Sequence, residues 1–168
     1  MKIQKLVLCA MLIAMCVIGA NIKLMGSVAF DAAPAFIGTL LLGPMYGAVL
    51  GIFGHLTSAL LAGFPLTLPI HLIVAGMMGV TMIAYGFTRQ KLAEKNQLVA
   101  ISVSSIVAFV FNCPLSLLAL YPLMHQAVFV LFPVLAIGSV CNIFVAEVVY
   151  QVLPERWKRR IAGYKQTK

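Results

Sequence analysis

A small set of ionisable and amide side chains interrupts long apolar stretches of this sequence. These residues are Asp31, His55, His71, Asn112, Ser116 and His125. Such groups are costly to place in lipid, and those found there usually face a cavity or a polar partner. In a six-helix arrangement they all fall towards the outer end of the helices, so we expect them to line one pocket. The chemistry on offer is hydrogen bonding to a small molecule.

Motifs for catalysis and for nucleotide hydrolysis are missing from the sequence. There is no G-x-x-x-x-G-K-[ST] phosphate loop, no G-x-S-x-G elbow and no H-E-x-x-H. His55 and Ser58 stand one helical turn apart as base and hydroxyl, but no third group is evident to orient the base. The four cysteines all lie in apolar stretches, which indicates neither a disulfide framework nor a metal site. We expect a binding and transport role, no cofactor, and an energy source on another protein.

The chain is far more apolar than a soluble domain. Its 168 residues are 62% hydrophobic and 10% charged, with a mean hydropathy of +1.06, against roughly 45–50% and ~25% in soluble domains. The apolar stretches follow one another through short connections. We therefore predict an all-α integral membrane protein with a single domain over residues 1–168.

Six helices are predicted, since about 20 apolar residues cross a bilayer. They cover residues 3–20, 28–42, 46–62, 70–88, 98–120 and 127–153, and a basic tail follows at 154–168. The second is short, and the count of six depends on it. Asp31 as a helix cap and Pro34 in the first turn mark its start, so capping and ligand contact remain alternative roles for Asp31.

Lysine and arginine favour a cytoplasmic location for both termini. With six spans, eleven of the twelve Lys and Arg residues lie on the inner side and Lys23 alone lies outside. A five-span arrangement with the N-terminus outside gives ten against two, so charge alone does not fix the count. A cleaved signal peptide is a further alternative, because Lys2 and Lys5 precede the first apolar run. The net charge of +8 is explained by an inner rim facing anionic lipid, without nucleic acid.

Small and polar residues recur at spacings of three and four along four of the predicted helices, which places them on one face of each. The stripes are Gly47, Gly51, Gly54, His55, Ser58 and Ala62; His71, Ala75 and Gly79; Ser105, Ala108, Asn112 and Ser116; and Gly138, Ser139, Asn142 and Ala146. For glycines and serines, helix packing is the favoured explanation. Glu147 lies nearer the cytoplasmic end, where we expect it to pair with a basic residue such as Arg89.

Two stretches carry a resemblance to a known family. The first helix contains AMLIA at residues 10–14, and FDAAPAFIG at 30–38 leads into LGPMYGAVLG at 42–51. The chain resembles the substrate-binding S components of energy-coupling factor (ECF) vitamin transporters, which are small six-helix proteins of prokaryotic cytoplasmic membranes. The resemblance implies capture of a vitamin or precursor from outside and association with a transmembrane coupling subunit of the EcfT type and two ATPase subunits. It also implies that Ala10 and Ala14 contact the coupling subunit, with internal packing as the alternative.

The resemblance further implies a pocket at the outer side. It carries over to Phe30, Asp31, His71, Asn112, Tyr121, His125 and Asn142. Lys23 as the one outer cation argues against a multiply anionic ligand, so a neutral or weakly cationic ligand fits better, and Phe30 and Tyr121 suit stacking on a flat ring. GSVAFD at 26–31 and GHLTSA at 54–59 resemble S components assigned to α-ribazole, a benzimidazole riboside used to complete cobalamin.

Other ligands and other classes of protein stay open. Riboflavin, thiamine, pantothenate and a queuosine precursor are the alternative ligands, and no spacing argument separates them. A self-sufficient secondary transporter would commonly show inverted repeats, which we do not find. A scaffold subunit would need no pocket.

Overall fold

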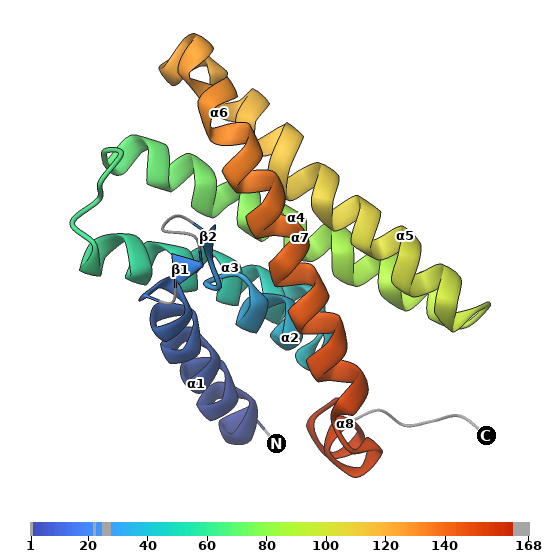
Figure 1. Ribbon diagram of the computed structural model, residues 1–168. Helices are drawn as coiled ribbons and strands as arrows, with labels where there is room; N and C mark the ends of the chain where they lie inside the picture. Colours follow the sequence, from blue (N-terminus) through green and yellow to red (C-terminus); the bar gives the residue numbers. More distant parts are fainter. Residues whose placement is uncertain (1, 22, 25–27, 163–168) are drawn as a thin grey trace.

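The computed structural model describes residues 2–21, 23–24 and 28–162. Its helices are α1 (Lys2–Asn21), α2 (Ala33–Leu42), α3 (Pro44–Leu61), α4 (Leu68–Ala93), α5 (Gln97–Val110), α6 (Ser116–Met124), α7 (Val128–Val152) and α8 (Glu155–Ala162). A π-helical turn (Phe111–Leu115) joins α5 to α6, and a 3-10 turn (His125–Ala127) joins α6 to α7. Two-residue strands β1 (Lys23–Leu24) and β2 (Val28–Ala29) form an antiparallel pair. Apart from this pair, the predicted all-α fold is confirmed for the described residues (Figure 1).

Four helical runs in the described part of the chain are long and apolar enough to cross a membrane. They are Ile3–Asn21, Pro44–Leu61, Leu68–Ala93 and the continuous run Gln97–Val152. The last run has 56 residues and reverses at His125, whose φ is 48°, so that α6 packs back against α7. The run Gln97–Val152 therefore supplies two antiparallel segments of the helix bundle. The protein is a membrane protein, as its composition predicts.

The second helix differs most from its prediction. Residues 28–29 belong to β2, and α2 begins only at Ala33. Residues 31 and 32 form a bend, and the Phe30 N–H donates to the Gly19 carbonyl of α1 at 3.0 Å. The ten residues of α2 cover about 15 Å, half of the ~30 Å hydrocarbon core. The predicted helix over 28–42 is thus wrong in its first five residues, and α2 is not a full span.

Asp31 does not cap α2, which corrects one of the two roles predicted for it. The capping residue is Ala32, without a side-chain hydrogen bond, and Pro34 lies in the first turn as expected. The Ala33 N–H instead donates to Oδ1 of Asn142 on α7 at 2.7 Å. A tertiary contact therefore takes the place of a local cap.

The glycine stripe of α3 is a packing surface, which confirms the favoured explanation. A Cβ added at Gly54 would lie 3.0 Å from Cβ of Cys16 on α1, and one at Gly51 would lie 3.2 Å from the Met78 carbonyl oxygen on α4. A Cβ at Gly47 would overlap Thr39 of α2. The stripe thus lets three helices approach the α3 backbone closely.

Four polar side chains form a buried cluster at the end of the helix bundle where α8 lies. They are Tyr85, Arg89, Ser104 and Glu147, called here the Arg89 cluster. Nη1 and Nη2 of Arg89 donate to Oε1 and Oε2 of Glu147 at 2.6 and 3.0 Å. The Tyr85 hydroxyl donates to Oε1 at 2.7 Å, and Nη1 of Arg89 lies 3.4 Å from Oγ of Ser104. The predicted pairing of Glu147 with Arg89 is confirmed. The pair joins α4 to α7, and Ser104 adds α5 to the cluster.

The same end gathers several chain segments. Gly43 between α2 and α3, Gln97 at the start of α5 and Lys158 of α8 line one cavity of about 450 Å³. In Figure 1 the start of α1 also lies towards α8. Of the predicted tail, Glu155–Ala162 is helical, and 163–168 lie outside the described residues, as do residues 25–27, which overlap the GSVAFD stretch.

Candidate functional site

A cavity of about 260 Å³ lies between α3, α4, α6 and α7, in the half of the bundle away from α8. Its lining is mostly apolar and comes from the segment before α2, the loop after α3, the π-helical turn and the four helices. The lining residues are Asp31, Ala32, His55, Leu66, Ile70, His71, Val74, Met78, Asn112, Ser116, Leu117, Leu120, Leu131, Val134, Leu135, Gly138, Ser139 and Asn142. A concave apolar pocket with a few convergent polar groups is the usual form of a small-molecule site.

One wall of the cavity carries Asp31, His55 and His71, called here the histidine chain. Nε2 of His55 lies 3.1 Å from Nδ1 of His71, within hydrogen-bond distance. Nδ1 of His55 lies 3.7 Å from Oδ2 of Asp31, which is too long for a hydrogen bond but close enough for electrostatic attraction. Nε2 of His71 and Nδ1 of His55 are buried without a hydrogen-bond partner. The histidine chain therefore ends at Nε2 of His71, an unpaired polar atom on a residue that lines the cavity.

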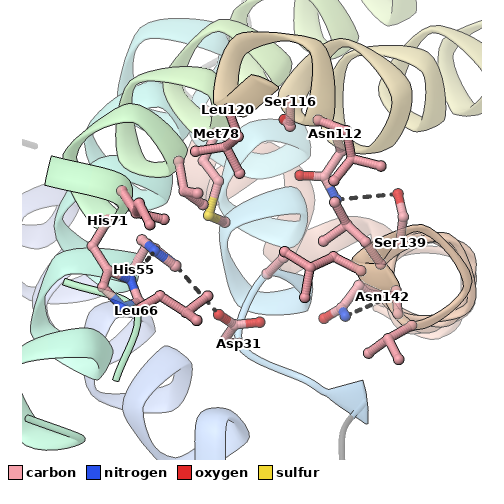
Figure 2. A pocket seen from close by; sticks show the side chains of 18 residues that line it. Asp31, His55, Leu66, His71, Met78, Asn112, Ser116, Leu120, Ser139 and Asn142 are labelled. Atoms are coloured by element: carbon pink, nitrogen blue, oxygen red, sulfur yellow. Dashed lines mark hydrogen bonds and ion pairs between the residues drawn. The ribbon is translucent and has the colours of Figure 1, made fainter. Parts of the chain in front are cut away.

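The facing wall carries Asn112, Ser139 and Asn142, called here the amide wall. Nδ2 of Asn112 donates to Oγ of Ser139 at 3.1 Å, and Nδ2 of Asn142 donates to the Gly138 carbonyl at 2.8 Å. Figure 2 shows the two histidines on one side of the cavity and these three residues on the other. The apolar side chains between them leave the two polar walls separated.

The π-helical turn explains how Asn112 reaches the cavity. Pro114 lies inside the turn and has no N–H to donate, so regular α-helical bonding cannot continue through it. One extra residue in the turn rotates the following helix relative to the preceding one, and such turns are frequent at functional sites. Sequence reasoning expected an unbroken helix over 98–120, whereas the structure interrupts it and extends α6 to Met124.

Six of the residues predicted for the pocket line this cavity. They are Asp31, His55, His71, Asn112, Ser116 and Asn142. Phe30, Tyr121 and His125 are not among the lining residues. Tyr121 and His125 are exposed near the α6–α7 turn, where their ring centroids lie 6.3 Å apart. The structure therefore brings together six of the predicted residues, all polar, and leaves Phe30, Tyr121 and His125 outside the cavity.

Two kinds of lining residue were missed. Ser139 belongs to a polar stripe and stands three residues before Asn142, so its spacing was a signal that it shares the face of that amide. Met78 and Leu120 carry no such signal, because apolar cavity walls and apolar cores use the same side chains.

The charges in the cavity argue against an anionic ligand. Asp31 is the one carboxylate in the lining, and the described lining contains no lysine or arginine. Within 2–21, 23–24 and 28–162, no group of three His, Cys, Asp or Glu side chains is arranged to hold a metal ion. Hydrogen bonding and apolar contact are what this arrangement provides.

The predicted interface residues lie on α1, away from the cavity. Ala10 and Ala14 are both exposed, whereas Cys9, Leu12 and Cys16 on the opposite side of the helix are buried. This exposure does not fit internal packing as the explanation of the alanine pair.

Comparison with known proteins adds one match. No curated protein and no solved structure matches the chain. A family model described as "ECF transporter, substrate-specific component" matches residues 4–154, which includes the whole cavity lining and the alanine pair. The chain therefore belongs to the substrate-specific components of ECF transporters, membrane subunits that serve transport rather than catalysis and work with an EcfT-type subunit and ATPase subunits.

Proposed function

We propose that this chain captures a compact neutral aromatic riboside, with α-ribazole as the specific candidate, and delivers it to an ECF importer. The observation that carries this proposal is the cavity with polar walls on two sides and apolar side chains between them. A benzimidazole ring suits the apolar middle, and ribose hydroxyls and ring nitrogens suit the polar walls. Riboflavin, thiamine, pantothenate and a queuosine precursor are the alternative vitamins or precursors.

The size and charge of the cavity support this ligand class. The cavity of about 260 Å³ is slightly smaller than the ~300–1,000 Å³ typical of small-molecule sites, which favours a nucleoside-sized ligand over an intact corrinoid. A phosphorylated ligand would need cationic partners, and the described lining has none.

The orientation follows from the basic residues near the α8 end. Lys91 and Lys95 follow the buried Arg89 at the end of α4, and Arg156 and Lys158 belong to α8. Short cytoplasmic segments collect lysine and arginine, so we place this end, and both termini, in the cytoplasm of a prokaryotic cell. The cavity then lies in the outer half of the membrane, where it receives ligand from outside.

The coupling surface is proposed to include Ala10 and Ala14. Their small exposed side chains leave room for the helix of a partner to approach the α1 backbone. The partner is the EcfT-type coupling subunit, and two ATPase subunits supply the energy that the chain itself cannot.

Ligand binding is tested with the purified chain in detergent micelles, by screening α-ribazole and the four alternatives for a rise in melting temperature. A ligand at a hundred times its Kd adds ~2.7 kcal/mol to the free energy of unfolding. We expect the largest rise with α-ribazole. If another vitamin gives the largest rise, the specificity is wrong, and if none gives a rise, the capture function itself is contradicted.

Coupling is tested by Ala10→Trp combined with Ala14→Trp. We expect uptake by cells to be lost while the isolated protein keeps its ligand affinity, because the tryptophans obstruct only the partner. Met15→Trp is the matched control, since Met15 is also exposed but lies about 100° around α1 from Ala14. Loss of affinity in the double variant would show that the alanines serve the fold of the subunit.

A further inference from the structure

The histidine chain leaves one specific atom without a partner. His71 is 8% exposed and lines the cavity, its Nδ1 faces His55, and its Nε2 has no hydrogen-bond partner. A buried polar atom left unpaired is unfavourable in free energy. Because His71 lines the cavity, a ligand bound there is the candidate for the missing partner. The question is then whether His71 donates or accepts.

The charge of Asp31, at the other end of the histidine chain, answers this question. A neutral imidazole carries one proton, and its neighbours determine which nitrogen holds it. The Asp31 carboxylate lies 3.7 Å from Nδ1 of His55, and this negative charge favours the proton on that nitrogen. With His55 in its neutral form, Nε2 is then an acceptor.

The tautomer of His55 determines that of His71. Because Nε2 of His55 accepts at 3.1 Å, Nδ1 of His71 has to be the donor. The remaining nitrogen, Nε2 of His71, then carries a lone pair and no proton. The opposite assignment would direct the lone pair of His55 Nδ1 at the Asp31 carboxylate, which is repulsive.

We propose that Nε2 of His71 is a fixed hydrogen-bond acceptor for the ligand, and that Asp31 and His55 are positioning residues that hold it in this state. The proposal rests on the proposed function and specifies its chemistry. The histidine chain selects ligands that present a hydroxyl or N–H donor, which in a riboside is a sugar hydroxyl. The flat ring then extends between Met78 and Leu120 towards the amide wall, where Asn112 can accept and donate.

The ligand side of the proposal is tested by calorimetric titration of the full chain with α-ribazole and its 2′-, 3′- and 5′-deoxy analogues. We expect one analogue to bind the wild-type protein about tenfold more weakly, because it lacks the donor that pairs with His71. His71→Phe, which keeps a ring but removes the acceptor, is expected to bind α-ribazole about tenfold more weakly and to lose the discrimination against that analogue.

The outcomes separate this inference from the function on which it rests. If α-ribazole binds but all analogues match it, or if His71→Phe keeps the discrimination, the acceptor role is wrong and the capture function stands. If the wild-type protein binds none of the four compounds, α-ribazole as its ligand and the sugar-hydroxyl contact fail together.

The tautomers themselves are tested on the wild-type protein without ligand, so the main result does not depend on whether a variant folds. The chain has three histidines, so ¹⁵N-histidine spectra of the wild-type protein are simple to interpret. We expect both His55 and His71 to be protonated on Nδ1, whereas the free residue in water favours a proton on Nε2. Asp31→Asn should give a mixture of tautomers, a change that a purely structural role for Asp31 would not produce. A proton on Nε2 of His71 in the wild-type protein would overturn the inference.

Discussion

The Arg89 cluster and the histidine chain both bury ionisable side chains among apolar helices, but they differ in how completely their atoms are paired. In the Arg89 cluster each carboxylate oxygen of Glu147 accepts from Arg89, and Tyr85 adds a further donor. In the histidine chain two ring nitrogens are buried without a hydrogen-bond partner. The first region is internally satisfied, whereas the second keeps unpaired atoms that the proposed ligand would complete.

This difference separates stability from binding. An internally paired charge cluster contributes to the fold whether or not a ligand is present, and breaking it exposes a buried charge to an apolar surrounding. A cluster that lacks partners gains nothing from its unpaired atoms until a ligand arrives. Substitutions in the Arg89 cluster should therefore change the free energy of unfolding, and those in the histidine chain should mainly change affinity.

The largest effect is expected for Glu147→Ala. The Arg89 guanidinium would remain buried without its counter-charge, at a cost of about 3–5 kcal/mol in the free energy of unfolding, measured by denaturation in micelles. The control is the double variant Arg89→Met, Glu147→Leu, which removes both charges and should recover more than half of the loss. A loss of under about 1 kcal/mol in the single variant would contradict an interior charge pair.

A smaller effect is expected for Asn142→Leu. This change removes the acceptor of the Ala33 N–H and should cost about 1–3 kcal/mol, with faster hydrogen–deuterium exchange at the start of α2. Ser139→Ala is the matched control, because Ser139 accepts from Asn112 on the same wall, a bond in which α2 takes no part. Equal exchange in α2 for both variants would show that Asn142 is not the anchor of this helix.

The sequence predicts contacts whose two partners are both conspicuous. Glu147 and Arg89 are rare charges in apolar stretches, so their pairing follows from the cost of leaving either one alone. The start of α2 could not be predicted in the same way. Its acceptor, Asn142, is 109 residues away in the chain, whereas Asp31, the local candidate, stands one residue before the capping position, which Ala32 occupies.

The cavity shows a similar division. Polar lining residues such as His71 and Asn112 stand out from their apolar surroundings and were predicted. The apolar lining was not, because Met78 and Leu120 differ from core residues only in what faces them. Pro114 is a sign of an irregular helix that the prediction over 98–120 did not use, and a proline alone does not specify a π-helical turn rather than a kink.

Tyr85→Phe tests whether the Arg89 cluster depends on each of its hydrogen bonds. Arg89 still pairs with both oxygens of Glu147, and the ring contact with Phe36, at a centroid distance of 5.2 Å, is preserved. We expect a loss of about 0.5–1.5 kcal/mol in the free energy of unfolding and no change in ligand affinity. A tenfold fall in affinity would mean that the Arg89 cluster and the cavity are coupled, which would break the separation drawn above.

The smallest effect is expected for Ser58→Ala, and it makes the sharpest comparison because the same change can be made in both regions. Ser58 stands one turn beyond His55, and its buried hydroxyl oxygen has no hydrogen-bond partner. Ser104 in the Arg89 cluster faces Arg89 and donates to the Ile101 carbonyl at 3.2 Å. Removing an unpaired buried hydroxyl should leave the free energy of unfolding within about 0.5 kcal/mol of wild type, or raise it.

Ser104→Ala, in contrast, removes a partnered hydroxyl and should cost about 1 kcal/mol. Both alanines leave a gap of similar size, so the difference between the two variants isolates hydrogen bonding from packing. Equal losses would mean that the Ser58 hydroxyl has a hydrogen-bond partner in solution. The two regions would then not differ at this position in how completely their hydroxyls are paired. A loss at Ser104 alone would show that the paired hydroxyl of the Arg89 cluster stabilises the fold and that the unpaired hydroxyl of Ser58 does not.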